Sequence, residues 1–137
     1  MIKLALADDH HQVRETWHLI LSTNPAFEVV AKCCNGQEAI AAAGEYLPDV
    51  FLMDINMKPV NGIEATETIT RLYPSVKIIG MSIHVEAIYV RRMLKAGAVA
   101  YVTKNSSYEE VFNAIMQVHE GRQYICDEVQ KNFRLCF

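Results

Sequence analysis

The stretch from Val50 to Met57, with the sequence VFLMDINM, limits the possible folds more than any other feature of this chain. An apolar run precedes a single carboxylate, Asp54, and this pattern indicates a buried strand that delivers one acidic side chain to the edge of a sheet. Solvent and ligands can reach such an edge. Asp54 is therefore the candidate reacting group.

Three further apolar runs also end on polar or ionisable side chains. They are residues 2–7 before Asp8 and Asp9, residues 76–81 before Ser82, and residues 99–103 before Lys104. In a parallel sheet the carboxyl ends of the strands lie along one edge, which is where ligands bind. The four runs therefore predict that three carboxylates, a hydroxyl and an ammonium group gather at that edge.

Strand and helix patterns alternate along the chain. Residues 27–33 are rich enough in β-branched side chains for a further strand. Helices are expected over residues 8–21, 35–47, 62–72, 85–96 and 108–120. The alternation predicts an α/β fold, a doubly wound five-stranded parallel sheet with five helices in the flavodoxin-like order 2-1-3-4-5. In that order the ligand site lies between strands one and three, where Asp8, Asp9 and Asp54 arrive.

The second and fourth helices carry terminal signals. Asn35 is the expected N-cap of the second helix, and Glu38, three residues later, completes a capping-box-like pair. Three residues of this helix are expected to face the core: Ile40, Ala43 and Leu47. Gly97 is expected to end the fourth helix as a left-handed C-cap.

Composition and charge exclude several classes of function. The chain has 137 residues, 51% of them hydrophobic, and fits one globular domain. Its net charge of −3 provides no basic patch for a nucleic-acid backbone. No apolar run approaches the roughly 20 residues that span a bilayer, so a soluble cytoplasmic protein without membrane contact is expected. The cysteines lack zinc-binding spacing and are expected to be free thiols: Cys33, Cys34, Cys126 and Cys136.

The motifs at the ends of the four runs resemble one known family. These motifs are Asp8-Asp9, Asp54 followed by Met57 and Gly62, Ser82, and Lys104. In this order and spacing they resemble the receiver domain of bacterial two-component response regulators. The phrases ADDH, NGIEAT and AGAVAYVTK are similar to the LuxR/NarL-type subfamily. The resemblance covers roughly residues 2–125, which is nearly the whole chain.

A magnesium site follows from the chemistry of the three carboxylates and from the resemblance. Carboxylates brought together repel one another unless protons or a cation neutralise them, and oxygen ligands of this kind suit Mg²⁺. The resemblance implies that Asp9 and Asp54 bind Mg²⁺ together with the main-chain carbonyl of Asn56. It also implies that Asp8 acts chiefly through water.

The resemblance further implies that Asp54 accepts a phosphoryl group from a sensor histidine kinase and becomes an aspartyl phosphate. Lys104 would stabilise the charge that spreads over the phosphoryl oxygens, and the hydroxyl of Ser82 would follow those oxygens. Tyr101 would swing inward when Ser82 moves, unless it is simply a half-buried strand aromatic. Such a domain catalyses only its own phosphorylation and dephosphorylation and is not otherwise an enzyme.

Two positions depart from the family pattern. Lys58 takes the place of the usual proline four residues after the phosphoacceptor, and Pro59 follows it. The spacing from Asp54 to Gly62 is unchanged, so a loop of normal length is expected. Asn105 follows Lys104 where many receivers have proline, which removes the usual reason for a cis peptide bond there.

Two other functional classes are weighed against the receiver. A haloacid-dehalogenase-like phosphatase also uses an aspartate nucleophile with Mg²⁺, but it would require Asp-x-Asp after the first strand. Here the adjacent pair Asp8-Asp9 is followed by His10. A flavodoxin-type flavin carrier would require a glycine- and hydroxyl-rich phosphate loop at this place, where the two carboxylates would repel a phosphate.

The output of the receiver has two possible forms. The LuxR/NarL-type phrasing favours the regulatory half of a transcription factor that binds DNA only through a C-terminal helix-turn-helix domain not present in this chain. A stand-alone phosphorelay receiver is the alternative. We expect residues 1–121 to form the receiver, and residues 122–137 to begin a linker toward the DNA-binding domain.

The last expected helix carries two apolar stripes. Residues at i, i+3, i+4 and i+7 spacing are expected to face the sheet: Val111, Ala114, Ile115 and Val118. Tyr108, Phe112 and Met116 form a second stripe, about 100° away around the helix. This second stripe predicts a homodimer interface that phosphorylation tightens, unless Tyr108 and Phe112 fold down as peripheral core.

Overall fold

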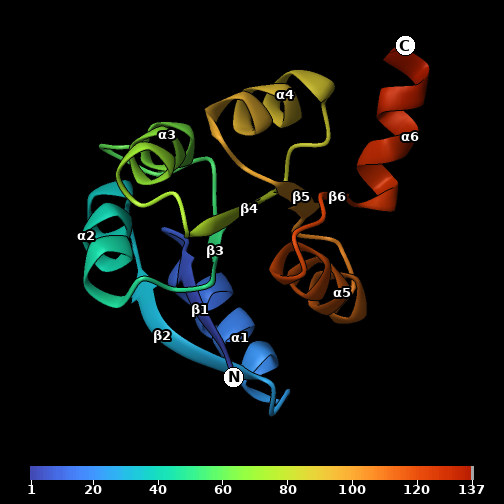
Figure 1. The fold of residues 1–137 in the computed structure, drawn as a ribbon. Helices are drawn as coiled ribbons and strands as arrows, with labels where there is room; N and C mark the ends of the chain where they lie inside the picture. Colours follow the sequence, from blue (N-terminus) through green and yellow to red (C-terminus); the bar gives the residue numbers. More distant parts are fainter. Residues whose placement is uncertain (137) are drawn as a thin grey trace.

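The computed structural model describes the backbone of residues 1–136 and the side chains of residues 1–131. All six strands run parallel in one sheet, in the order β2-β1-β3-β4-β5-β6 (Figure 1). The strands are β1 (Ile2–Ala7), β2 (Phe27–Cys33), β3 (Val50–Met53), β4 (Lys77–Ser82), β5 (Ala100–Thr103) and β6 (Tyr124–Ile125). The helices are α1 (His11–Ser22), α2 (Gly36–Tyr46), α3 (Gly62–Leu72), α4 (Ala87–Ala96), α5 (Tyr108–His119) and α6 (Asp127–Cys136).

The helices cover both faces of the sheet, as expected for a doubly wound fold (Figure 1). Helices α2, α3 and α4 lie on one face, whereas α1 and α5 lie on the other. The four residues of β3 are all buried, because this strand lies inside the sheet and has helices on both sides. This explains why the strand is apolar throughout rather than alternating. Within the described residues, no helix is both long and apolar enough to cross a membrane.

The flavodoxin-like α/β fold and the order of its first five strands agree with the sequence prediction, but the expected count of five strands and five helices is wrong. The structure adds β6, which pairs with β5 through Ala100 and Tyr124, and α6 after it. A strand of two residues is too short to show an alternating pattern, so periodicity could not reveal it. Residue 137 and the side chain of Cys136 lie outside the described part, so the expected free thiol of Cys136 stays a prediction.

Two local predictions about helices are also wrong. Helix α1 begins at His11 rather than at Asp8, because Asp8 and Asp9 lie in the loop that leaves β1. Leu47 does not face the core. It ends α2 in the left-handed conformation, with φ of 44°, and its side chain is 54% exposed. Pro48 follows, and the chain must turn there because proline cannot continue a helix.

The predicted helix ends are otherwise close to the observed ones. The side chain of Asn35 accepts a hydrogen bond from the N–H of Glu38, as in a capping box. The carboxylate of Glu38 in turn accepts a hydrogen bond from the N–H of Cys34, one residue earlier than the usual donor. Gly97 ends α4 with φ of +123°, a conformation that side chains rarely adopt. A Cβ atom there would also lie 2.3 Å from the hydroxyl of Thr70.

Candidate functional site

Asp8 and Asp54 end two neighbouring strands and are held there by the backbone. The N–H of Asp8 donates to the carbonyl of Cys33 at the end of β2, and the N–H of Asp54 donates to the carbonyl of Ala7 at the end of β1, each at 3.0 Å. Both carboxylates are buried, with exposed fractions of 5% and 3%. The carboxyl ends of β1 and β3 therefore bring two acidic groups together inside the protein.

Asp9 and His10 complete a compact cluster with these two residues. Ligand atoms of Asp8, Asp9, His10 and Asp54 all lie within 4.8 Å of one another. The Nδ1 atom of His10 lies 3.1 Å from a carboxylate oxygen of Asp9. The sequence predicted that Asp8, Asp9 and Asp54 converge, and the structure places them together. The sequence analysis did not predict His10 as a member of the cluster, although the position of His10 directly after the acidic pair was the available signal.

Lys104 reaches the cluster from the loop after β5. Its Nζ atom lies 2.9 Å from Asp8 Oδ2 and 3.5 Å from Asp54 Oδ2. The longer of these contacts is an ion pair rather than a hydrogen bond. Asp54 Oδ2 is buried and has no hydrogen-bond partner among the residues that the structure describes. One buried oxygen of Asp54 is therefore available to a further group.

The pKa of Asp54 reflects this environment. Burial and, after it, the negative charge of Asp8 raise this pKa, and the ammonium of Lys104 opposes them, so that the net pKa shifts from 3.8 to about 6. Burial alone would lower the pKa of Lys104. Its contacts with Asp8 and Asp54 outweigh that effect, so the net pKa of Lys104 is raised and the side chain stays charged. The site thus holds a positively charged lysine beside a carboxylate whose pKa is raised toward neutral pH.

Gly62 lets α3 begin directly behind Asp54. Its N–H donates to the carbonyl of Ile55 at 2.8 Å. A Cβ atom on Gly62 would lie only 1.9 Å from the main-chain oxygen of Asp54, so any side chain would push the loop away. The side chain of Asn61 caps the helix by accepting from the N–H of Glu64. This glycine therefore fixes how closely the loop after β3 approaches the phosphoacceptor candidate.

Ser82 and Tyr101 are both fully buried and meet at the loop after β4. The N–H of His84 donates to the hydroxyl of Ser82 at 3.1 Å, and the hydroxyl of Tyr101 donates to the carbonyl of His84 at 2.8 Å. Tyr101 therefore lies inward in this structure. Its side chain is fully buried, whereas its strand position alone had suggested a half-buried side chain.

His84 also connects this loop to the loop after β3. Its Nε2 atom lies 2.8 Å from the side-chain nitrogen of Asn56, and its ring stacks on Tyr89 with centroids 4.1 Å apart. The sequence analysis did not single out His84. A lone histidine in an irregular loop gives no periodic or spacing signal, so only the structure shows that it bridges the two loops.

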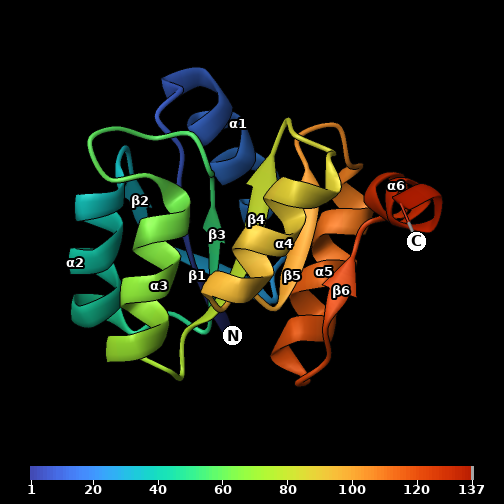
Figure 2. The ribbon, with the colours of Figure 1, turned by 90° about the horizontal axis from the view of Figure 1, so that it is seen from above.

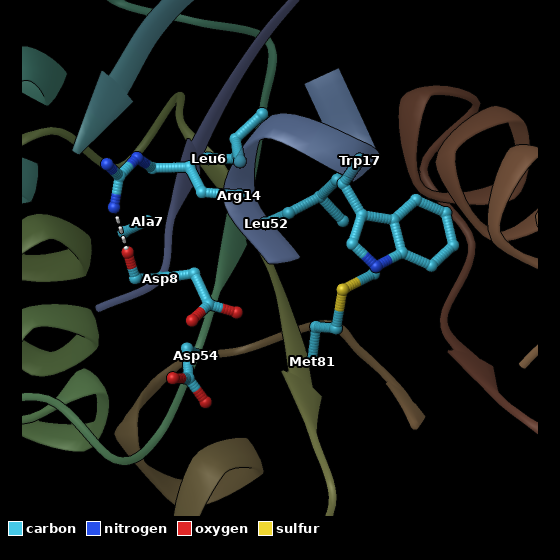
Figure 3. A pocket seen from close by; sticks show the side chains of 8 residues that line it. All are labelled: Leu6, Ala7, Asp8, Arg14, Trp17, Leu52, Asp54 and Met81. Atoms are coloured by element: carbon cyan, nitrogen blue, oxygen red, sulfur yellow. Dashed lines mark hydrogen bonds between the residues drawn. The ribbon is translucent and has the colours of Figure 1, made fainter. Parts of the chain in front are cut away.

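A small cavity of about 10 Å³ lies beneath the carboxylates (Figure 3). Asp8 and Asp54 line it on one side, and Trp17 and Met81 line it on another. Arg14, which the sequence analysis also missed, donates from its guanidinium to the main-chain carbonyl of Asp8 at 2.8 Å. The cavity places the indole of Trp17 near the acidic cluster.

Lys58 and Pro59 line an open hollow beside the acidic cluster. Asp9, His10 and Asn56 line the same hollow. The peptide bond between Lys58 and Pro59 is cis, and no other cis bond occurs in the described backbone. The Lys104–Asn105 bond is accordingly trans. The loop keeps the expected length, and its proline is displaced by one position within it.

The two stripes of α5 differ in their surroundings. Val111, Ala114, Ile115 and Val118 are buried, as predicted. Phe112 packs edge-on against Phe27 of β2, with ring centroids 5.3 Å apart, and is partly buried. Tyr108 and Met116 are exposed at 53% and 37%. Phe112 therefore belongs to the periphery of the core, while the two residues beside it stay on the surface.

The comparisons with known proteins agree on one family. The family described as "Response regulator receiver domain" matches residues 4–116. The transcriptional regulatory protein DegU of Brevibacillus brevis is 41% identical over 131 residues, which cover 96% of this chain and 56% of that protein. The response regulator UvrY of Escherichia coli is 34% identical and is covered to 62%. This chain thus spans only about three fifths of the length of such relatives.

Solved structures give the same result. A two-component response regulator of the LuxR family from Aurantimonas sp. SI85-9A1 has a TM-score of 0.93 and 29% identity, with 97% of this chain and 95% of that chain covered. The signal receiver domain of the putative response regulator NarL from Mycobacterium tuberculosis has a TM-score of 0.84 and 28% identity, with 88% of this chain and 98% of that chain covered.

Proposed function

The chain belongs to the response regulator receiver family of two-component systems, in its LuxR/NarL-type branch, and we propose that Asp54 is its phosphoacceptor. One observation carries this proposal. Asp54 is the buried acid at the carboxyl end of β3, and its Oδ2 atom lies 3.5 Å from the ammonium of Lys104 and has no hydrogen-bond partner among the described residues. A buried oxygen beside a cation, without a hydrogen bond of its own, suits a nucleophile.

The reaction would transfer a phosphoryl group from a phosphohistidine of a sensor kinase. An oxygen of ionised Asp54 attacks phosphorus, the P–N bond breaks, and the leaving imidazole nitrogen keeps the bond electrons and takes up a proton. Lys104 stabilises the charge on the phosphoryl oxygens, and its ion pair with Asp8 orients it for this task. The receiver is a signalling domain rather than a classical enzyme, and we propose that it catalyses only its own phosphorylation and dephosphorylation.

The residues of the cluster fit a magnesium ion. Its oxygen donors and the unbonded oxygen of Asp54 match the ligands that Mg²⁺ prefers. Asp9, Asp54 and the main-chain carbonyl of Asn56 would hold the ion, and Asp8 would act through water. When bound, Mg²⁺ neutralises the carboxylates and the incoming phosphoryl oxygens. Its positive charge also favours ionised Asp54, against the burial that raises the pKa of this residue.

We further propose that Ser82 and Tyr101 read out the phosphorylation. The hydroxyl of Ser82 would turn from the N–H of His84 toward the new phosphoryl oxygens. Tyr101 already lies inward, bonded to the carbonyl of His84, and this rotamer would be the one that phosphorylation favours. Phosphorylation then shifts a population between two rotamers rather than creating a new conformation.

The output is proposed to be transcription. DegU is named a transcriptional regulatory protein, and this chain spans only part of its length. We propose residues 1–121 as the receiver and residues 122–137 as the start of a linker to a DNA-binding domain, so that DNA contact lies outside this chain. A cytoplasmic location, a sensor histidine kinase as donor and a homodimer through α5 complete the proposal. A stand-alone phosphorelay receiver remains the second candidate, because Asp54 would work in the same way.

Phosphorylation by a small phosphodonor tests the assignment of Asp54. With phosphoramidate and Mg²⁺, intact-mass spectrometry should show one added phosphoryl group on the wild type and none on Asp54→Asn. Asp49→Asn is the matched control, because Asp49 stands just before the same strand at its opposite end. Labelling of Asp54→Asn equal to that of the wild type, or labelling in the presence of a chelator, would show that the assignment is wrong.

A further inference from the structure

Residues 124–131, here called the C-terminal strap, pack onto the edge of β5. The N–H of Tyr124 donates to the carbonyl of Val99 at 3.2 Å, and the N–H of Cys126 donates to the carbonyl of Tyr101 at 3.0 Å. The strap comprises β6 and the first half of α6, and this helix lies beside α4 (Figure 2). The side chains of Cys126 and Val129 are fully buried. This first part of the proposed linker is therefore docked on the receiver at this edge.

One carboxylate of α5 holds the strap in place. Glu110 Oε2 accepts a hydrogen bond from the hydroxyl of Tyr124 at 2.7 Å and another from the N–H of Asp127 at 3.0 Å. The second bond satisfies a main-chain N–H at the start of α6, where a negative charge is favourable. Inside the strap, the side-chain amide of Gln130 donates to the carbonyl of Ile125 at 2.6 Å. Loss of Glu110 would remove both bonds from α5 at once.

Tyr101 connects the strap to the phosphoacceptor side of the molecule. Its main-chain carbonyl accepts the bond from Cys126, and its hydroxyl donates to His84 in the loop that follows Ser82. The ring lies on the face of the sheet that α4 covers. A Cβ atom on Gly80 would meet both this ring and the side chain of Met93 from α4. The strap and α6 border the same face, next to the side of β5 on which the ring lies.

From this arrangement we infer that docking of the C-terminal strap and phosphorylation of Asp54 stabilise each other through Tyr101. The docked strap covers the edge of β5 that the ring would cross if it turned outward, and so it holds the inward rotamer. The inference rests on the proposed function, which assigns that rotamer to the phosphorylated state. Coupling between two sites is reciprocal for binding free energies, so phosphorylation tightens the strap by the same factor by which the strap favours phosphorylation.

Beryllium fluoride with Mg²⁺, a mimic of the phosphoryl group, makes both directions measurable. Calorimetric titration at fixed Mg²⁺ should show affinity about fivefold or more lower for Glu110→Ala than for the wild type. Glu109→Ala is the matched control, because it removes the same charge from the neighbouring, exposed position. Tyr124→Phe removes only one of the two bonds to Glu110 and should give an intermediate loss. This milder variant serves as well if Glu110→Ala folds poorly.

Hydrogen exchange tests the reverse direction in the same samples. Beryllium fluoride should slow amide exchange in residues 124–131 of the wild type. The expected factor is the one by which the wild type binds beryllium fluoride more tightly than Glu110→Ala does. Equal affinities of Glu110→Ala and Glu109→Ala, or tighter binding by Glu110→Ala, would overturn the inference, even where binding still requires Asp54. If the wild type binds no beryllium fluoride, or Asp54→Asn binds it equally well, the proposed function itself fails.

Discussion

Asp54 holds its charge in unfavourable surroundings, and this should appear as a pH dependence of stability. The folded protein binds the proton of Asp54 more tightly than the unfolded chain does, because the pKa rises from 3.8 to about 6. The contribution of Asp54 to the free energy of unfolding therefore falls as the pH rises through this window and stays low above it. Across this window the contribution of Asp54 to the free energy of unfolding changes by about 3 kcal/mol.

Asp54→Asn removes this penalty and should be more stable than the wild type at pH 7, by up to about 3 kcal/mol. The difference in free energy of unfolding between the two proteins should disappear below about pH 4, where the wild-type carboxyl is protonated in the folded and the unfolded state. Urea unfolding with a chelator present measures this, with Asp49→Asn as the control. A constant gap at all pH values would contradict the raised pKa of Asp54.

The two acids at the end of β1 should contribute unequally to metal binding. Asp9→Ala removes a direct ligand, whereas Asp8→Ala removes a water-mediated one, so Asp9→Ala should weaken Mg²⁺ binding more, by about tenfold or greater. Trp17 lines the cavity that also contains Asp8 and Asp54, so its fluorescence should report the titration. Equal losses in the two variants would show that the ranking is wrong.

The sequence predicted the acidic and basic groups of the site because each one ends an apolar strand, and parallel strands bring their carboxyl ends together. It did not predict His10, Arg14 or His84. These side chains lie in loops or on the first turns of a helix, where no strand register fixes their position. Their contacts depend on how the loops fold back over the sheet, which only the tertiary structure determines.

Among the elements, α5 offers a direct test of which stripe residues belong to the core. Phe112 packs on Phe27, so Phe112→Ala should lower the free energy of unfolding by about 2 kcal/mol, less than for a fully buried ring. Tyr108 is half exposed, so Tyr108→Ala should change it by less than about 1 kcal/mol. Urea unfolding compares the two variants. Similar losses would mean that the stripe is buried as a whole.

Helix and strand boundaries were predictable where a residue of special conformation stands at the boundary. Asn35 marked the start of α2, and Gly97 marked the end of α4. Leu47 was placed wrongly because helical periodicity extends an apolar stripe past the real end of the helix. The strand β6 escaped prediction because its main-chain bonds to β5, rather than its side-chain pattern, make it a strand.

For the molecule as a whole, the proposed homodimer can be tested at the exposed part of the second stripe of α5. Met116 is the better position for substitution, because Phe112→Glu would also disturb the core. Sedimentation velocity should show that beryllium fluoride with Mg²⁺ promotes dimers of the wild type and not of Met116→Glu. Leu72→Glu is the control, since Leu72 is similarly exposed on another helix. A wild type that stays monomeric up to high micromolar concentration in both states would refute the dimer.

The sixth strand also affects how the sheet meets other chains. The outermost strands of a parallel sheet have unpaired N–H and C=O groups, with which another chain can pair. β6 covers β5 and leaves an outer strand of only two residues, which is too short to template a long pairing. At the opposite border, β2 presents the charged residues Glu28 and Lys32, and Lys32 pairs with Glu15 at 2.9 Å. Both borders therefore resist edge-to-edge aggregation, and a variant that releases the C-terminal strap would expose β5 to this hazard.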